Sequence, residues 1–182
     1  YSHKQIALIL EEEDKSKENK RKPLPTAGAS LCALKAVADI SFSMVAGWWL
    51  CVGRVEEFSE PGDYKAIRIA GEPLVICRGV DGELRAFRNL CQHRGVEVAV
   101  GQGNTKKFTC RYHAWTYDTK GKLAGAPHND EVEGFDFKNC RLPAVKIDTW
   151  GGYIFVNFDP YSKSLNDCLD EDGVRKFADF LQ

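Results

Sequence analysis

Two short segments of the chain each pair a cysteine with a histidine. The first reads Cys91-Gln92-His93 and the second, after sixteen further residues, reads Cys110-Arg111-Tyr112-His113. Two thiolates and two imidazoles suit either a tetrahedral zinc ion or a [2Fe–2S] cluster with mixed ligands. Such short spacings let one loop present a sulfur and a nitrogen together. The sequence therefore predicts a metal centre held between two facing loops.

Short strands separated by turns are expected to position these loops. Four apolar runs have the length and composition of strands: 64–70, 73–78, 84–87 and 152–158. Asp81-Gly82 lies between two of them, a strong hairpin signal because glycine accepts the positive φ of a tight turn. A second hairpin is predicted around 119–121, between strands at 115–117 and 122–124. Gly101-Gln102-Gly103 is expected to form the flexible tip between the two ligand loops.

Many short strands indicate an all-β fold, an antiparallel sandwich or small barrel with a cluster-binding subdomain of two loops. Helical segments are expected to flank it. Residues 11–22 carry five acidic and five basic residues with no apolar stripe, which favours a solvated arm over a helix. We expect an arm and helical segment at 1–46, the metal-binding domain at 47–160, and the start of a helical linker at 161–182.

Composition limits the possible partners and compartments. The 182 residues are 43% hydrophobic and carry a net charge of -1, so a core can form and a nucleic-acid partner is not expected. No stretch approaches the roughly 20 apolar residues of a membrane span. Seven scattered cysteines do not form a secreted disulfide framework. These features predict a reducing compartment, the cytoplasm or an organelle interior.

The sequence resembles the Rieske [2Fe–2S] family. The resemblance rests on NLCQHRG at 89–95 and FTCRYHAWTYDTKGKL at 108–123, and it extends to WGGYIFVNF at 150–158. Over 47–160 the chain looks like the N-terminal part of a Rieske non-haem iron oxygenase large subunit. The resemblance implies that Cys91 and Cys110 bind one iron and that His93 and His113 bind the other, with no catalytic residue in this chain. Neutral imidazoles make their iron easier to reduce, which suits a one-electron relay.

Departures from related patterns refine this expectation. Respiratory Rieske proteins add a disulfide and a serine near the cluster, and the corresponding positions here are Val96, Tyr112 and Trp115. Fewer hydrogen bonds to the sulfurs imply a lower potential. The family usually has proline at position 111 and glycine at position 114. Arg111 adds a charge beside the cluster, and Ala114 requires that its turn tolerate a Cβ.

Rieske oxygenases activate O2 at a separate mononuclear iron held by two histidines and a carboxylate. Only His3 and His128 remain in this chain, and no triad pattern is present. The expected activity is one-electron transfer into a catalytic domain that hydroxylates an aromatic or quaternary-amine-like substrate. The resemblance implies a ferredoxin or flavin reductase as donor, and a catalytic domain in cis or on a neighbouring subunit of a homotrimer. The alternatives are a free-standing Rieske ferredoxin and a zinc-stabilised interaction module.

Overall fold

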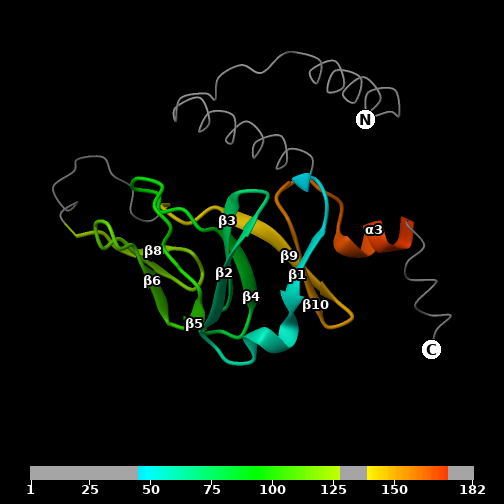
Figure 1. Cartoon of the computed structure of the whole chain (residues 1–182), viewed down its shortest axis with the longest axis horizontal. Helices are drawn as coiled ribbons and strands as arrows, with labels where there is room; N and C mark the ends of the chain where they lie inside the picture. Colours follow the sequence, from blue (N-terminus) through cyan, green and yellow to red (C-terminus); the bar gives the residue numbers. More distant parts are fainter. Residues whose placement is uncertain (1–44, 128–138, 172–182) are drawn as a thin grey trace, which may run out of the picture. The chain divides into compact units, whose positions relative to one another are not determined.

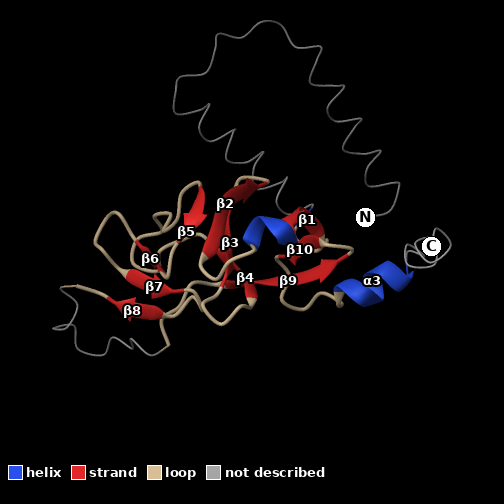
Figure 2. Cartoon of the chain, turned by 90° about the horizontal axis from the view of Figure 1, so that it is seen from below, coloured by secondary structure: helices blue, strands red, loops and turns tan. Residues whose placement is uncertain are grey.

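The computed structural model describes residues 45–127 and 139–171. The predicted arm and helical segment at 1–46 lie almost wholly outside the described residues, as does most of the tail beyond Glu171. Within the described residues, antiparallel strands form two sheets (Figure 1). This confirms the expected all-β class, with the larger sheet curled like half of a barrel (Figure 2).

The larger sheet has seven strands in the order β1-β10-β9-β4-β3-β2-β5. Its strands are β1 (Leu50–Arg54), β2 (Asp63–Ile69), β3 (Glu72–Arg78), β4 (Leu84–Arg88), β5 (Gln102–Asn104), β9 (Ala144–Trp150) and β10 (Tyr153–Asn157). A 3-10 helix, η1 (Val55–Phe58), links β1 to β2. The hydrogen-bonded neighbours β1 and β10 come from distant parts of the chain, with Leu50 opposite Val156.

Strand β3 lies between two hydrophobic clusters because its residues alternate between the faces of the sheet. Leu74 and Ile76 belong to a cluster shared with β4, β9 and β10. Val75 and Cys77 belong to the other cluster, which lies toward the predicted metal loops and includes Cys91 and Cys110. All four β3 side chains are fully buried. The strand therefore joins the main sheet to the part of the domain that carries the candidate ligands.

The smaller sheet has three strands in the order β6-β7-β8. These strands are β6 (Lys107–Thr109), β7 (Thr116–Asp118) and β8 (Leu123–Gly125). The turn between β7 and β8 packs on the main sheet through Gly121, which has φ +77°. A Cβ built on Gly121 would lie 2.5 Å from the ring of Phe87 on β4, so only glycine fits this approach.

Both predicted hairpins are confirmed. Gly82 lies in the turn between β3 and β4 with φ +84°, and the second turn joins β7 to β8. The prediction for Gly101-Gln102-Gly103 is wrong in part. Residues Gln102–Asn104 form β5, which pairs with β2 along the edge of the larger sheet instead of projecting as a free tip.

A short helix, α3 (Leu165–Glu171), agrees with the helical segment expected after residue 160. Leu165 is buried, and the indole N–H of Trp49 donates to the carbonyl oxygen of Lys163 just before the helix. In the described part of the chain, no helix is long and apolar enough to cross a membrane. The domain boundaries at 47, 160 and 161 remain predictions.

Candidate metal centre

The two cysteine–histidine segments form loops with the same pattern of backbone hydrogen bonds. In the first loop, the N–H of Cys91 donates to the Val96 carbonyl, and the N–H of Gly95 donates back to the Cys91 carbonyl, each over 2.8 Å. In the second loop, the N–H of Cys110 donates to the Trp115 carbonyl over 2.8 Å, and the N–H of Ala114 donates to the Cys110 carbonyl over 3.0 Å. Each cysteine therefore stands at the base of an equivalent tight loop.

The two loops also share a left-handed residue at the same position. Gly95 has φ +69° and Ala114 has φ +56°. A residue with a Cβ is strained in this region, whereas glycine is not. The expectation that the turn must tolerate the Cβ of Ala114 is therefore confirmed, at a cost of about 1–2 kcal/mol in backbone strain.

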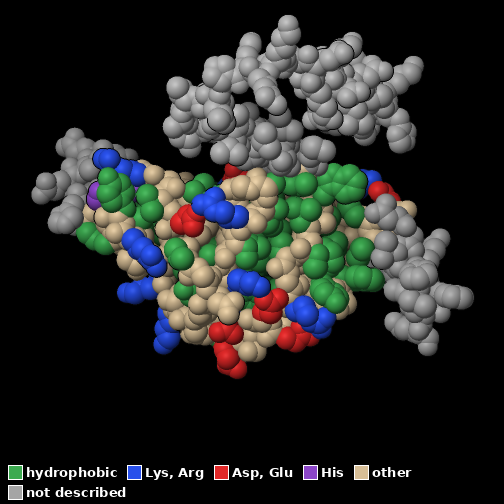
Figure 3. All heavy atoms as spheres, viewed as in Figure 1, with side chains coloured by type: hydrophobic (Ala, Val, Ile, Leu, Met, Phe, Trp, Pro, Cys, Tyr) green, Lys and Arg blue, Asp and Glu red, His purple; other side chains and the backbone are tan. Residues whose placement is uncertain are grey.

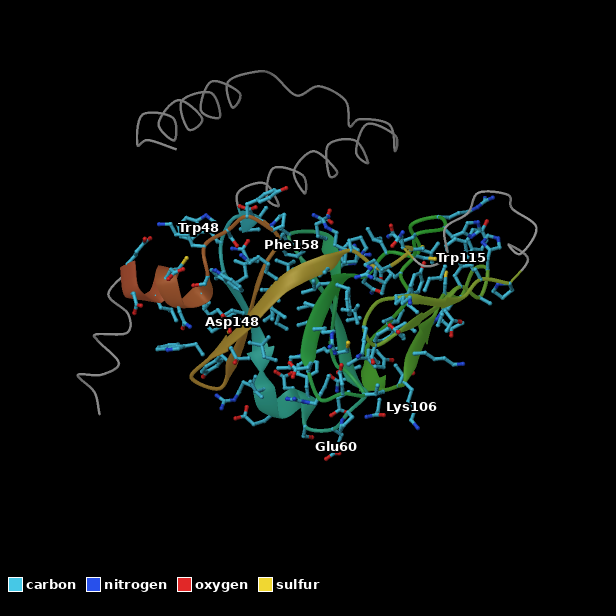
Figure 4. All side chains as sticks on the ribbon, turned by 180° about the vertical axis from the view of Figure 1, so that it is seen from behind. Trp48, Glu60, Lys106, Trp115, Asp148 and Phe158 are labelled. Atoms are coloured by element: carbon cyan, nitrogen blue, oxygen red, sulfur yellow. The ribbon has the colours of Figure 1, made fainter. Side chains whose placement is uncertain are left out.

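The histidines occupy adjacent, not equivalent, positions of the two loops, and this offset brings their rings together. The ring centroids of His93 and His113 lie 4.6 Å apart at 66°. The buried indole of Trp115 stacks on His93, with centroids 4.8 Å apart and planes 9° from parallel. Tyr112 covers His113 at 3.9 Å. Aromatic neighbours thus hold both imidazoles in fixed orientations at the end of the domain where Figure 4 shows Trp115.

The two thiols are more shielded from solvent than the two imidazole rings. Cys91 and Cys110 are both buried among the apolar side chains of the second cluster, whereas His113 is exposed. The Tyr117 hydroxyl on β7 lies 3.4 Å from the Cys91 Sγ and accepts the N–H of Gln92 over 2.9 Å. Because that hydroxyl oxygen already accepts one hydrogen bond, its own proton is free to point at the sulfur.

A buried asparagine closes the base of the first loop. The Asn89 Oδ1 accepts the N–H groups of Val98 and Ala99, both over 3.0 Å, and its Nδ2 donates to the Ala99 carbonyl over 2.8 Å. The side chain is fully buried, so each bond is shielded from water. Asn89 therefore ties the two ends of the loop that carries Cys91 and His93.

The surroundings of the site favour the protonation states in which its side chains can bind a metal or support a ligand. Partial desolvation lowers the pKa of His113, and the nearby charges of His93 and Arg94 lower it further. Neutral imidazole is the form that coordinates a metal. Burial raises the pKa of Tyr117, so its hydroxyl keeps the proton that it can donate to Cys91.

These residues fit a cluster that divides its ligands between two irons. In the described part of the chain, no three His, Cys, Asp or Glu side chains converge as a site for one metal ion. A [2Fe–2S] cluster needs only two protein ligands for each iron, and two loops that each carry a buried thiol and one of two contacting imidazoles suit that need.

Sequence reasoning found the four candidate ligands but missed Tyr117 and Asn89. Their roles depend on pairings that bring Tyr117 beside Cys91 and Asn89 beside Ala99. Trp115, just before β7, and Tyr117, within it, are two apart in the sequence and both buried, a signal that Tyr117 faces the same core as Trp115. His3 and His128 lie outside the described residues.

Comparison with known proteins identifies the domain type. Residues 48–136 match the family model of the Rieske [2Fe–2S] domain. The chain is 42% identical over 128 residues to the carnitine monooxygenase oxygenase subunit of Acinetobacter pittii, covering 70% of this chain and 34% of that protein. It is 37% identical over 127 residues to the benzene 1,2-dioxygenase alpha subunit of Pseudomonas putida, covering 68% and 28%.

Solved structures of Rieske oxygenases also match the chain. A quaternary ammonium Rieske monooxygenase, studied for carnitine oxidation and inter-subunit electron transfer, superposes on this chain with a TM-score of 0.66 at 41% identity. The superposition covers 68% of this chain and 34% of that one. Naphthalene 1,2-dioxygenase with bound indole gives 0.67 at 29% identity, over 74% and 31%. The chain thus spans about a third of the length of the relatives it matches, which are oxygenase subunits.

Proposed function

Residues 48–136 belong to the Rieske [2Fe–2S] domain family, and from this premise we propose that the chain is the electron-entry domain of a Rieske oxygenase. The observation that carries the proposal is the pair of equivalent loops, which carry two buried thiols and two contacting imidazoles. The likeness to oxygenase subunits supports this function over that of a free-standing ferredoxin.

We assign Cys91 and Cys110 to one iron and His93 and His113 to the other. Bound there, the cluster supplies one-electron redox chemistry. The buried thiolates keep solvent from one side of the site, and the imidazoles form the side nearest to the surface. Trp115 and Tyr112 fix the planes of the two rings. With Cys91 bound as a thiolate, the Tyr117 hydroxyl 3.4 Å away would donate a hydrogen bond to its sulfur.

The remaining parts of the proposal concern the whole protein. A ferredoxin or flavin reductase supplies the electrons, and a catalytic domain with a mononuclear iron, in cis or on a neighbouring subunit of a homotrimer, receives them. The substrate is an aromatic or quaternary-amine compound, as in the relatives' names. Within the described residues six cysteines are free, which supports a reducing, cytoplasmic location. Residues 47–160 form the Rieske domain and 161–182 begin the linker.

Metal analysis tests the cluster assignment directly. We expect two irons and two acid-labile sulfides per chain, as in any [2Fe–2S] protein. Cys91→Ser should lose most of the iron, because a buried thiolate ligand is removed. Cys51→Ser is the matched control, since Cys51 is exposed and outside both loops, and it should retain full iron content. One zinc and no sulfide per chain would refute the assignment.

An assay of product formation tests whether this chain transfers electrons without hydroxylating a substrate by itself. The chain should accept electrons but form no hydroxylated product when supplied with NADH, a reductase, O2 and a panel of aromatic and quaternary-amine substrates. The reason is that O2 activation needs an iron with open coordination positions. Only His3 and His128 remain beyond the proposed ligands. Product formed by this chain alone would show that it holds a second iron site.

A further inference from the structure

A cavity of about 260 Å³ is lined by aromatic rings and one carboxylate. Its described lining comes from three parts of the chain: the segment just before β1, strand β10 and helix α3. Three of these residues are aromatic, Trp48, Trp49 and Phe155, and Glu171 is the single charged residue among them. We call this space the tryptophan cavity.

The tryptophan cavity lies far from the candidate metal centre. Figure 4 places Trp48 at the end of the domain opposite Trp115. Figure 3 shows that hydrophobic side chains gather over β1 and β10. Most lysine, arginine and acidic side chains in that view lie along the lower edge and at the end with β6 and β8. A ligand in the tryptophan cavity would therefore not contact the proposed cluster.

Hydrogen bonds hold the wall of the cavity in place. The fully buried Asn157 side chain donates from Nδ2 to the Gly47 carbonyl over 3.1 Å. The indole N–H of Trp49 donates to the Lys163 carbonyl over 3.1 Å. These polar groups are therefore already engaged, and a ligand need not satisfy them. A wall that is ordered before binding also lowers the entropic cost of binding.

The two indoles offer aromatic surface to a cation. Trp48 is 69% exposed, although tryptophan is highly buried on average in folded proteins. The ammonium of Lys146, which is not among the described lining residues, lies 5.9 Å from the centroid of the Trp49 ring. That distance is within the range of a cation–π interaction, and tryptophan is the strongest of the aromatic partners. The protein itself thus places a cation against this aromatic wall.

The helical wall of the cavity is acidic. Within 165–171, helix α3 carries Asp167, Asp170 and Glu171 and no lysine or arginine. The Glu171 side chain is 60% exposed, and its Oε1 lies 2.6 Å from the ammonium of Lys163. The carboxylate is therefore ionised and already holds one cation. An anionic ligand would be repelled here, whereas a cation would be attracted.

A methylated ammonium group matches this combination of aromatic rings and negative charge. A primary ammonium or a hydroxyl group must regain hydrogen bonds when it leaves water. A quaternary ammonium has no hydrogen to donate, so aromatic faces and a nearby carboxylate are sufficient to hold it. Aromatic cages recognise choline and methyl-lysine in this way.

We propose that the tryptophan cavity binds a small organic cation that carries a methylated ammonium group. Trp48 and Trp49 contact the methyl groups, and Glu171 supplies the negative charge at the rim. This inference goes beyond the proposed function and does not depend on the cluster, because the described lining contains no proposed iron ligand.

A titration with two matched compounds tests the proposal. Choline is compared with 3,3-dimethyl-1-butanol, in which a carbon atom replaces the charged nitrogen at nearly the same size. The iron-loaded chain is labelled with ¹⁵N, and the indole N–H signals of Trp48 and Trp49 report binding by NMR. Choline should bind with a Kd in the millimolar range, about tenfold tighter than its neutral analogue. Equal Kd values for the two compounds would overturn the proposal.

Variants assign the binding to the named side chains. Trp48→Ala should weaken choline binding about tenfold, and Trp48→Phe should recover part of the loss because a smaller aromatic face remains. Glu171→Gln should weaken binding about threefold, whereas Lys163→Gln should strengthen it about twofold by releasing the carboxylate from its ion pair. A purely structural role of this ion pair would shift both Kd values in the same direction and would overturn the assignment of Glu171. Trp150→Phe, outside the described lining, is the control and should leave the Kd unchanged.

Three other results have a defined meaning. Absence of choline binding would overturn the proposal, as would happen if another part of the chain filled the cavity. Self-association in sedimentation that is abolished by Trp48→Ala and unaffected by choline would assign the exposed indole to a second copy of the chain, and would also overturn it. Absence of iron and sulfide would overturn the proposed function alone, because choline binding would still be expected.

Discussion

Removal of one hydroxyl, in Tyr117→Phe, should lower the reduction potential of the protein. The Tyr117 oxygen lies 3.4 Å from the Cys91 sulfur and receives the Gln92 N–H, so its proton is available to that sulfur. A donor to a ligand sulfur stabilises the reduced state more, because the reduced state carries one more negative charge. Phenylalanine keeps the buried ring and removes only this donor.

The size of the effect follows from the strength of such a bond. Hydrogen bonds to charged groups contribute about 1.5–3 kcal/mol, and only the part that differs between the two redox states moves the potential. We take that part as about 1 kcal/mol. For a one-electron couple, a tenfold change in the equilibrium constant, or 1.4 kcal/mol, corresponds to about 59 mV. The Tyr117→Phe protein should therefore have a potential about 40 mV lower than the wild type.

Protein-film voltammetry measures this shift, and iron content confirms that both proteins are fully loaded. Tyr64→Phe is the matched control, because its hydroxyl bonds weakly to the Val100 carbonyl at 3.4 Å and not to a proposed ligand. It should leave the potential unchanged. A Tyr117→Phe potential within about 10 mV of the wild type would refute the assignment of this hydroxyl as a donor to a ligand sulfur.

Three further predictions concern stability, measured as the free energy of unfolding in denaturant. Gly121→Ala should cost about 3 kcal/mol, because its Cβ would clash with the Phe87 ring and its backbone would be strained. Gly82→Ala, with open space around it, should cost only about 1 kcal/mol from backbone strain. Equal losses in the two variants would contradict the packing argument. Ala114→Gly should stabilise by about 0.5–1 kcal/mol, and a loss would argue against the left-handed turn. Hydrogen bonds from Arg85 and Lys120 hold the pKa of Asp81 below its usual value near 3.9. The ionised Asp81 side chain therefore stabilises the fold above about pH 4, and this contribution is lost as the pH falls further. In the Asp81→Asn protein the free energy of unfolding should fall less steeply below about pH 4 than in the wild type, and an equally steep fall in both proteins would disprove this linkage.

Local signals explain which parts of the fold could be predicted. The turns at Gly82 and Gly121 are encoded by residues within the turn, and the ligand loops are encoded by their own short spacings. Strand β5 could not be predicted in this way, because its exposed residues have no apolar alternation. Its pairing with β2 rests on backbone hydrogen bonds and on a side-chain hydrogen bond from Asn104 to Asp63, which are far apart in the sequence. The expected low potential stays a prediction. Sequence spacing could not show that the Tyr117 hydroxyl lies 3.4 Å from the Cys91 sulfur.

The pairing of β1 with β10 has a consequence for synthesis of the chain. Leu50 pairs with Val156, so β1 leaves the ribosome long before its neighbour in the sheet exists. Strands β2, β3 and β4 pair with one another through local hairpins and can form first. Until Tyr153–Asn157 emerges, β1 remains a strand without its partner, open to pairing with other chains. We expect nascent chains that stop before Tyr153 to aggregate and require chaperones, whereas chains that extend past Asn157 can close the sheet.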